Sequence, residues 1–340
     1  MNAVLAPAAP AEAARRIPAS MGKRNRARDA DGALRTTLRH RLEYLLVRAG
    51  AFALLCTDVR GAARIGAFFG RLVGTVDRRH RLVAEDNLRR AVGLGLAGED
   101  VRNTAFRVYE GLGITAAEFV HGPRRLRGRA AAQWFRIEGA EALRTATGGG
   151  SVVFLGGHLG NWEHLVPAMR IAGFDIVPVA RPLDNPLLDR WVAGIRSAAG
   201  NRPVPKMGAL RGLARTLREG RCVGMLVDQN GGRHGRLAAF FGRPCSTQGA
   251  GVALARRFHV PFSLAAIQRR RPGVHRLLLG PAVFVRDDDA AEGEAVQEMN
   301  RQLEALVRAR PAEWMWLHRR WRIKADWGFP VEPTEGARKP

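Results

Sequence analysis

Acidic residues are scarce in this chain of 340 residues, which has 31 Asp and Glu against 55 Lys and Arg and therefore a formal net charge of +24. Because this excess is spread along the chain, it indicates attraction to a polyanionic partner, and nucleic acid, anionic lipid and phosphorylated substrates all stay open. Cysteine is scarce too. Cys56, Cys222 and Cys245 have neither zinc-site spacing nor the even count of a disulfide framework, so we expect a reducing compartment.

Long apolar runs are missing as well. No stretch of about 18 uncharged apolar residues occurs, because the best candidate, residues 42–56, contains Glu43 and Arg48. Whether this stretch spans a membrane or lies on one stays open. The first residues lack the layout of a secretory signal, since Pro7 and Pro10 interrupt their apolar run, and we therefore expect a protein that is not exported.

The amino-terminal quarter divides into two predicted parts. Residues 1–34 combine Ala, Pro and basic residues and are expected to form a disordered tail. Residues 35–92 are predicted to form amphipathic helices, because apolar residues from 65 to 76 recur at helical spacing while Arg64, Arg71 and Arg78 repeat on another face. Such a helix fits a membrane interface with its arginines at phosphate level, and it fits equally a helix that covers a core.

Residues 93–328 are predicted to form an α/β domain with a mixed, largely parallel sheet covered by helices, followed by a disordered tail at 329–340. Short apolar runs alternate there with helical patterns, as expected for a sheet buried on both faces. A strand pair around 275–285 and a helix over about 291–308 complete the predicted fold. The four predicted strands are 151–155, 175–179, 222–227 and 262–267, and the helices between them are 161–172, 186–199, 207–219 and 247–258.

The stretch that carries chemistry is 151–165, SVVFLGGHLGNWEHL. A hydrophobic strand runs into a glycine-rich turn, His158 follows at the strand end, and Glu163 lies on the first turn of the next helix. Ligands of open α/β sheets gather at the carboxyl ends of strands, and glycines let a substrate approach the backbone. His158 is therefore predicted as a general base, and Glu163 as the group that accepts its other ring N–H.

Competing interpretations of this stretch are weaker. A second H-x-x-x-x-E match, His80 with Glu85, lies in a continuous helical pattern, where five residues make about 500° and point the side chains apart. A zinc site made of His158, Glu163 and His164 lacks the i, i+4 histidine spacing of helical zinc motifs. The chain has no G-x-S-x-G or Walker A motif, so a serine hydrolase and a P-loop nucleotide site have no support. Its one G-x-G-x-x-G match, GLGLAG at 93–98, follows a helical pattern instead of the strand that a dinucleotide site requires.

An ordered series of blocks resembles the bacterial lipid A biosynthesis acyltransferases, the late lauroyl and myristoyl transferases within the wider lysophospholipid acyltransferase group. The likeness covers about residues 38–325. The blocks are GGHLGNWE at 156–163, ARPLDNPLL at 180–188, VDQN at 227–230, AFFG at 239–242, the strand opened by Pro261, and WMWLHRRW at 314–321.

The resemblance implies transfer of a fatty acyl group from an acyl thioester, carried by acyl carrier protein or CoA, to a hydroxyl of an anionic membrane glycolipid. No metal or other cofactor is implied. His158 would deprotonate the acceptor hydroxyl while Glu163 holds the ring, and main-chain N–H groups in the glycine turn or near Asn161 would stabilise the oxyanion. The implied location is the cytoplasmic face of a bacterial inner membrane.

Three further residues are implied to bind substrate. Arg181 would contact a phosphate through its planar donor fork, although a structural ion pair with Asp184 or Asp228 is the alternative. Asp228 and Gln229 end a strand and would either shape the site or stabilise the loop that follows. An acyltransferase for another glycolipid, such as a phosphatidylinositol mannoside, and a basic nucleic-acid-binding protein are the competing functions, but the nucleic-acid hypothesis rests on charge alone because no recognition motif occurs.

Overall fold

The computed structural model describes residues 36–91, 93, 99–126, 129–200, 204–205 and 209–329. The predicted amino-terminal tail and all but the first residue of the predicted carboxyl-terminal tail lie outside these ranges. Among the described residues, no helix combines the length and the apolar character needed to cross a membrane.

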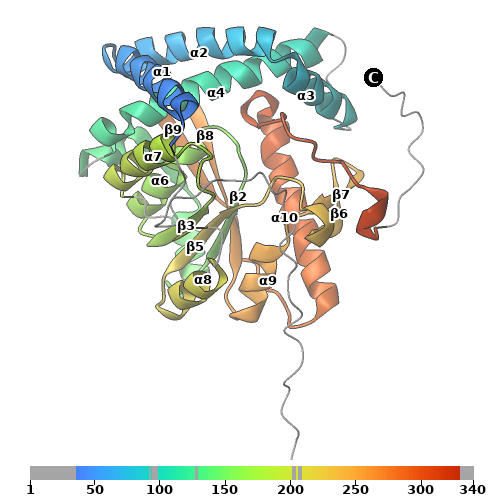
Figure 1. The fold of residues 1–340 in the computed structure, drawn as a ribbon. Helices are drawn as coiled ribbons and strands as arrows, with labels where there is room; N and C mark the ends of the chain where they lie inside the picture. Colours follow the sequence, from blue (N-terminus) through green and yellow to red (C-terminus); the bar gives the residue numbers. More distant parts are fainter. Residues whose placement is uncertain are drawn as a thin grey trace, which may run out of the picture.

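The centre of the fold is a seven-stranded sheet with the order β1-β9-β8-β2-β5-β3-β4 (Figure 1). Every neighbouring pair is parallel except β8 and β9, which are antiparallel, so the predicted mixed, largely parallel sheet is confirmed. The strands are β1 (Phe135–Glu138), β2 (Val153–Gly156), β3 (Ile176–Ala180), β4 (Val204–Pro205), β5 (Cys222–Leu226), β8 (Phe262–Arg271) and β9 (Val274–Leu279).

Helices cover both faces of this sheet, which explains why its strands read as continuous apolar runs. Val153 and Leu155 of β2 belong to one buried cluster, together with residues of α8, α9 and α10, whereas Phe154 belongs to a second cluster with residues of α5 and α6. The helices concerned are α5 (Ala140–Thr147), α6 (Leu165–Ile171), α8 (Ala209–Arg218), α9 (Ala250–Arg257) and α10 (Asp289–Ala309), and α7 (Pro186–Ala198) lies beside α4.

A separate helical layer lies across one end of the α/β domain (Figure 1). It consists of α1 (Leu38–Leu55), α2 (Val59–Val76), α3 (Arg78–Arg90) and α4 (Glu99–Arg125). Helices α2 and α4 touch through glycines: a Cβ on Gly66 would lie 2.4 Å from the carbonyl oxygen of Gly113, and a Cβ on Gly113 would lie 1.9 Å from that of Gly66. Only glycine permits backbones to approach this closely.

This packing decides which face of α2 points outward. The buried residues of α2 are all Ala and Gly, whereas its large apolar side chains, including Phe68, Phe69 and Val76, are exposed. A helix that covers a core would bury the large side chains instead. Arg64 and Arg71 lie on α2, but Asp77 caps the next helix, so Arg78 belongs to α3 and the arginine series does not continue along one helix.

The remaining differences from the predicted elements are local. The sequence analysis missed the antiparallel hairpin of β6 (Arg236–Phe240) and β7 (Arg243–Thr247), and because β7 includes Thr247, helix α9 begins only at Ala250. Beyond β9, Val283 makes a single bridge to β8 and no second strand of the expected pair forms. The helix predicted over 161–172 is divided between a short 3₁₀ helix, η2 (Trp162–His164), and α6. The short 3₁₀ helices are η1 (Arg129–Trp134), η2 (Trp162–His164), η3 (Gly232–His234), η4 (Pro311–Glu313) and η5 (Ala325–Trp327).

Candidate active site

His158 and Asp228 meet at the carboxyl ends of the neighbouring parallel strands β2 and β5. The register pairs Gly156 with Leu226, and each of the two functional residues follows its strand's paired residue by two positions. The His158 Nδ1 atom lies 2.8 Å from Asp228 Oδ1, and the His158 main-chain N–H donates to Oδ2 at 2.7 Å. The carboxylate therefore fixes both the backbone and the ring of the histidine.

The electrostatics of this pair follow from its burial. Asp228 is fully buried, which by itself would raise its pKa, but the charge of His158 and the hydrogen bonds from its ring and main-chain N–H hold that pKa below the usual range. Burial would lower the pKa of His158, yet the charge of Asp228, its hydrogen bond and the charge of Glu163 raise it. An ionised Asp228 only accepts hydrogen bonds, so the neutral ring carries its proton on Nδ1 and its lone pair on Nε2.

The carboxyl-terminal segment after α10 contacts both His158 and Asp228. The indole Nε1 of Trp314 donates to Asp228 Oδ2 at 2.8 Å, and His318 Nε2 lies 3.1 Å from the main-chain oxygen of Asp228. The main-chain N–H of Met315 donates to the carbonyl of His158 at 3.0 Å. The W-x-W-x-H segment thus holds the backbone of His158 and the buried carboxylate of Asp228, while the His158 ring stays partly exposed.

Glu163 is held by a residue that the sequence analysis did not single out. Arg196, on α7, donates through Nε to Glu163 Oε2 at 2.9 Å and through its terminal nitrogen to Oε1 at 2.6 Å. The Nδ1 position that the sequence analysis assigned to Glu163 is taken by Asp228. The charge of Glu163 still raises the pKa of His158, although less than the charge of Asp228 does.

The other predicted site residues lie at different depths. Arg181 directly follows β3 at the same edge of the sheet, and its side chain is 65% exposed at 3.7 Å from Asp184. Asn161 is fully buried and donates to Glu118 of α4 at 2.9 Å, so its side chain serves the framework beneath the turn. Gln229 is partly buried next to Asp228.

Three main-chain N–H groups of the glycine turn already donate hydrogen bonds to other groups of the protein. The main-chain N–H of His158 donates to Asp228, that of Leu159 to Gly157 at 2.8 Å, and that of Gly160 to Glu313 at 2.9 Å. Gly160 needs its small size, since φ is +58° and a Cβ there would lie 2.0 Å from the carbonyl oxygen of Ile267. These amides are therefore not free to bind an oxyanion, contrary to part of our sequence-based expectation.

An apolar cavity of ≈ 100 Å³ is lined by Gly156, Trp162 and Glu163, which flank His158 in the chain. Its lining includes Trp162, whose ring centroid lies 5.1 Å from that of His158, and the Glu163–Arg196 ion pair. The deeper lining consists of apolar side chains from β2, β3, β5 and α6, namely Phe154, Leu165, Val166, Met169, Ile176, Pro178, Val179, Met225 and Leu226. A narrow apolar cavity beside a histidine suits a hydrocarbon chain whose reactive end lies at that histidine.

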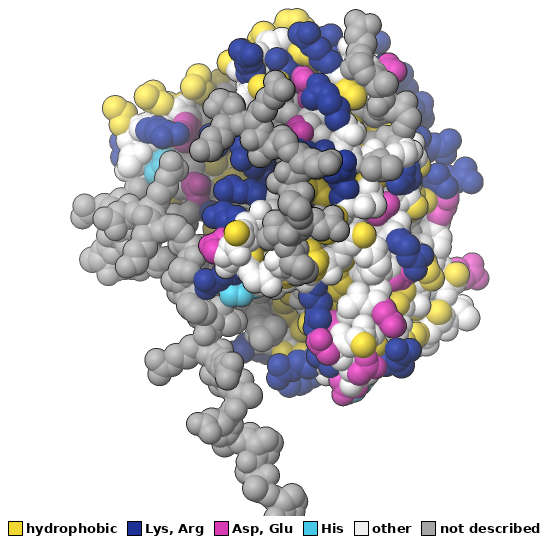
Figure 2. All heavy atoms as spheres, turned by 90° about the vertical axis from the view of Figure 1, so that its right-hand side faces the viewer, with side chains coloured by type: hydrophobic (Ala, Val, Ile, Leu, Met, Phe, Trp, Pro, Cys, Tyr) yellow, Lys and Arg dark blue, Asp and Glu magenta, His cyan; other side chains and the backbone are white. Residues whose placement is uncertain are grey.

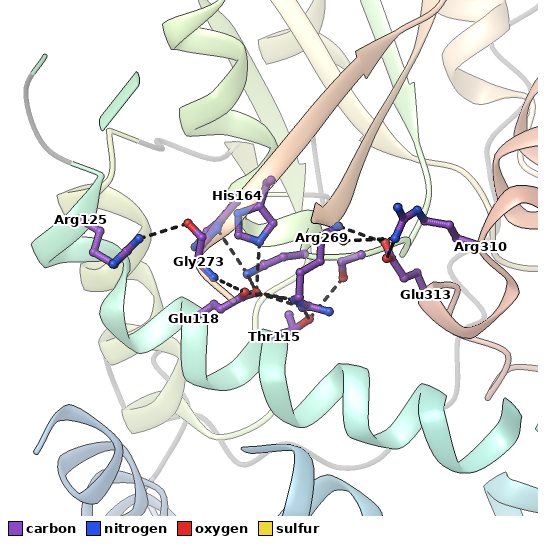
Figure 3. Close-up of polar contacts among 11 residues, drawn as sticks. Thr115, Glu118, Arg125, His164, Arg269, Gly273, Arg310 and Glu313 are labelled. Carbon is purple, nitrogen blue, oxygen red and sulfur yellow. Dashed lines mark hydrogen bonds and ion pairs between the residues drawn. The ribbon is translucent and has the colours of Figure 1, made fainter. Parts of the chain in front are cut away.

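Beneath the turn, a buried carboxylate ties α4 to the β8–β9 hairpin (Figure 3). Glu118 accepts hydrogen bonds from Arg269 Nε, the main-chain N–H of Gly273, His275 Nε2 and Asn161 Nδ2 at distances between 2.9 and 3.2 Å. Burial would raise its pKa, but the charge of Arg269 and the His275 contact hold that pKa well below the usual value. Glu118 is thus an ionised carboxylate inside the protein, stabilised by a complete set of donors.

This network joins the outer helical layer to the turn that carries His158. Thr115 of α4 donates to the carbonyl of Gly160 at 3.3 Å and accepts from Arg269 at 2.8 Å. His164 is fully enclosed next to it, and burial followed by the neighbouring His275 lowers the pKa of His164 to about 3. Hydrogen bonds from α4 to Gly160 and Asn161 thus fix the position of the turn that carries His158.

Nothing in this region is arranged as a metal centre. Within the ranges given above, the structure has no cluster of three or more His, Cys, Asp or Glu side chains able to hold a metal ion. The three ligands of the zinc alternative go to different partners: His158 to Asp228, Glu163 to Arg196, and His164 to the Asn161 amide at 3.4 Å.

Comparison with known proteins agrees with the resemblance that the sequence blocks indicated. Residues 34–323 match the model of the family described as bacterial lipid A biosynthesis acyltransferase. The chain belongs to this family. It is 25% identical over 198 residues to the lipid A biosynthesis palmitoleoyltransferase of Escherichia coli K12, 27% over 158 residues to the lauroyltransferase of the same strain, and 27% over 199 residues to a lipid A biosynthesis acyltransferase of Haemophilus influenzae.

These alignments cover part of each protein. They span 56%, 45% and 57% of this chain, and 63%, 50% and 62% of the three relatives in the same order. Membership of the lipid A acyltransferase family gives the charge-based nucleic-acid hypothesis no support. Asp228 was expected, like His158, to follow a strand of one parallel sheet, but nothing local in the sequence showed that the two strands are neighbours. Arg196 and Glu118 carried no local signal either.

Proposed function

We propose that this protein transfers a fatty acyl chain from an acyl thioester, carried by acyl carrier protein or CoA, to a hydroxyl of a lipid A precursor. The observation that carries the proposal is that Trp162, which lines the apolar cavity, packs against His158, the histidine that Asp228 orients. A base that can take a hydroxyl proton and a cavity that can take a hydrocarbon are the two parts that such a transfer needs.

In this mechanism, His158 Nε2 takes the proton of the acceptor hydroxyl as its oxygen attacks the thioester carbonyl. Asp228 accepts the Nδ1–H, which holds the ring in the required tautomer and stabilises the imidazolium. The tetrahedral intermediate then collapses, the carbon–sulfur bond breaks, and the imidazolium returns its proton to the leaving thiolate. General base catalysis of this kind contributes about 10²–10⁴-fold.

Glu163 and the start of η2 support the same step. The Glu163 charge adds to that of Asp228 in favouring the imidazolium, and Arg196 fixes its carboxylate at the mouth of the cavity. With three turn amides already engaged, we assign the oxyanion to main-chain N–H groups at the helix start, at Asn161 and Trp162. Arg181, exposed at the same sheet edge, would hold a phosphate of the acceptor or the donor.

The outer helical layer is proposed to rest on the cytoplasmic surface of the inner membrane. Its exposed apolar side chains belong mainly to α1 and α2 and include Leu42, Leu46, Phe52, Phe68, Phe69, Leu72 and Val76. Arg64 and Arg71 accompany them on α2, and the whole chain carries a net charge of +24, which suits an anionic surface. Residues 36–126 would thus form the membrane-facing part and residues 129–329 the acyltransferase part.

Vesicle sedimentation tests the membrane face. Phe68→Ser with Phe69→Ser should weaken binding to vesicles that contain anionic lipid, and binding of the unaltered protein should fall as salt rises, because surface charges are screened over about 8–10 Å near physiological ionic strength. Phe284→Ser is the matched control, since Phe284 is 63% exposed outside the helical layer. Equal losses in both variants would remove α2 from the membrane face.

The activity is tested by the lipids of a strain that lacks the protein. Mass spectrometry of extracted lipid A should show species that lack one acyl chain, and these should disappear when the unaltered gene is restored. Unchanged lipid A masses in the deletion strain, with a change in another acylated glycolipid instead, would contradict the proposed acceptor.

A further inference from the structure

A basic cleft lies on the side of the molecule that carries α3 and the carboxyl-terminal loop, away from the apolar cavity at His158. Its volume is ≈ 630 Å³. Four arginines, Arg79 and Arg90 from α3 and Arg319 and Arg322 from the loop, surround it, and Leu82 and Trp321 contribute apolar surface. No role in the acyl transfer described above uses these side chains.

The loop that supplies Arg319 and Arg322 is held rigidly. Asn87 of α3 donates to the carbonyls of Trp316 and His318 at 2.7 and 2.6 Å. From the other side, Asn230 donates to the carbonyl of Arg322 at 2.7 Å. Two buried or partly buried amides therefore fix the loop backbone, and a fixed backbone presents its side chains with little loss of conformational entropy on binding.

The arginines of this loop have divided roles. Arg320 is fully buried and donates to the Ser246 carbonyl at 2.7 Å and to Thr247 Oγ1 at 2.9 Å, so it stabilises the fold. Arg319 and Arg322 are exposed and point to the other side, where they line the cleft.

The cleft has an excess of positive charge. Its one carboxylate, Asp86, pairs with Arg90 at 2.8 Å. Within the described part of the chain, the guanidinium groups of Arg79, Arg319 and Arg322 form no ion pair with a carboxylate. Three uncompensated planar forks around one cleft suit a ligand with several anionic oxygens, because guanidinium and phosphate match in geometry and bond in pairs.

The position of the cleft indicates where such a ligand comes from. Leu82 on its rim is 47% exposed, and Val76, at the end of α2, is 80% exposed. Figure 2 looks onto this side of the molecule and shows apolar side chains along the upper edge with Lys and Arg side chains beneath them. If the apolar edge enters a bilayer, the arginines below it lie at the depth of the headgroups.

We propose that the cleft between α3 and the 318–322 loop binds the phosphate of a membrane lipid headgroup, preferring a phosphomonoester. The inference rests on the membrane-facing part of the proposed function. Arg319, Arg322 and Arg79 bind the phosphate oxygens, while Leu82 and Trp321 contact the apolar part of the lipid next to the headgroup. The cleft is a second anchoring point, distinct from the place where acyl transfer occurs.

Binding of the full-length protein to two kinds of vesicle tests this proposal. Both kinds consist of phosphatidylcholine, one with phosphatidic acid and the other with a carboxylate lipid, adjusted to the same zeta potential. The variant Arg319→Gln with Arg322→Gln is compared with Arg211→Gln with Arg257→Gln, which removes equal charge from exposed arginines of α8 and α9 at the far end of the domain. His158→Ala is included to separate binding from transfer.

The unaltered protein and the α8/α9 variant should bind phosphatidic acid vesicles more tightly than carboxylate vesicles. The cleft variant should lose this preference and bind phosphatidic acid vesicles about tenfold or more weakly, because it lacks two charged contacts to the phosphate. His158→Ala should bind phosphatidic acid vesicles as the unaltered protein does. The binding test therefore does not depend on whether His158 is the catalytic base. Equal losses in the two arginine variants, or a raised KM for the soluble acyl donor with unchanged vesicle binding, would overturn the proposal.

Discussion

Asp228 contacts His158 twice, through one oxygen to the ring Nδ1 at 2.8 Å and through the other to the main-chain N–H at 2.7 Å. The second contact anchors the turn that carries the histidine, so the ring is oriented by a carboxylate that also holds its backbone. Trp314 completes the arrangement by donating to the same carboxylate. The orientation of the His158 ring thus depends on a residue 70 positions away in the sequence.

Asp228→Asn should lower the rate and move the acid limb of the pH profile. The base must be neutral, so kcat/KM falls as the pH drops through the pKa of His158. Since the charge of Asp228 raises that pKa, its removal lowers the pKa and moves the acid limb to lower pH. The rate at the plateau should fall by about 10²–10⁴-fold because the tautomer is no longer fixed.

Asp175→Asn is the control for this profile, because Asp175 is an exposed carboxylate that pairs with Arg221 at 2.7 Å away from the site. Its acid limb should coincide with that of the unaltered protein. An Asp228→Asn profile with an unshifted acid limb would show that another group limits the rate.

Arg181→Ala should raise the KM for one phosphorylated substrate far more than it lowers kcat. A contact present in both ground and transition states contributes uniform binding. The melting temperature should not change, because the ion pair with Asp184 is exposed at 3.7 Å and such pairs contribute about 0–1 kcal/mol. Arg215→Ala, which removes an exposed pair with Glu219, should leave both KM values unchanged. A destabilised Arg181→Ala protein with normal KM values would instead support a structural role.

Glu118→Gln should destabilise the fold by about 3–5 kcal/mol, because it leaves the largely buried Arg269 without its carboxylate. Glu110→Gln is the matched control on the same helix. It removes a partly exposed pair with Arg71, which contributes about 1 kcal/mol or less. Urea unfolding measures the free energy of unfolding of both variants. Similar losses in the two would show that the buried network does not stabilise the fold.

Gly113→Ala should disrupt the packing of α4 on α2, because the added Cβ would lie 1.9 Å from the carbonyl oxygen of Gly66 and the two backbones would have to separate. In Gly50→Ala the new methyl has no atom within 4 Å, and the change should stabilise α1 by up to about 1 kcal/mol. The melting temperature should therefore fall in Gly113→Ala and rise in Gly50→Ala. A Gly113→Ala protein as stable as its parent would show that the close approach of the two helices is not required.

The central sheet could be predicted from sequence because local signals carry it. The runs that became β2, β3, β5 and β8 are apolar, of strand length and bounded by turns, and the glycine turn placed His158 at a strand end. The hairpin of β6 and β7 escaped because its strands have little apolar alternation: β6 contains two consecutive alanines and β7 includes Pro244.

The site was predictable only in part, because its partnerships join distant segments. His158 stands at the strand end as expected, but its neighbour depends on β5 lying next to β2, which the order of strands along the chain does not specify. The ion pair of Glu163 with Arg196 was missed for a similar reason, because Arg196 lies on α7, far from Glu163 in the sequence. The spacing of the apolar residues in α2 predicted a helix but did not show which of its faces is buried. The small residues on the opposite face determine this, because its glycines pack closely against α4.

The central claim, that His158 is the general base of acyl transfer, is tested most directly by assaying purified His158→Ala with an acyl thioester and a lipid A precursor, with product detected by mass. Transfer should fall by at least about 10²-fold at an unchanged melting temperature. His80→Ala should keep full activity, since His80 is exposed on α3 beside Asp77. A tenth or more of the parent's activity in His158→Ala, or an equal loss in His80→Ala, would contradict the assignment.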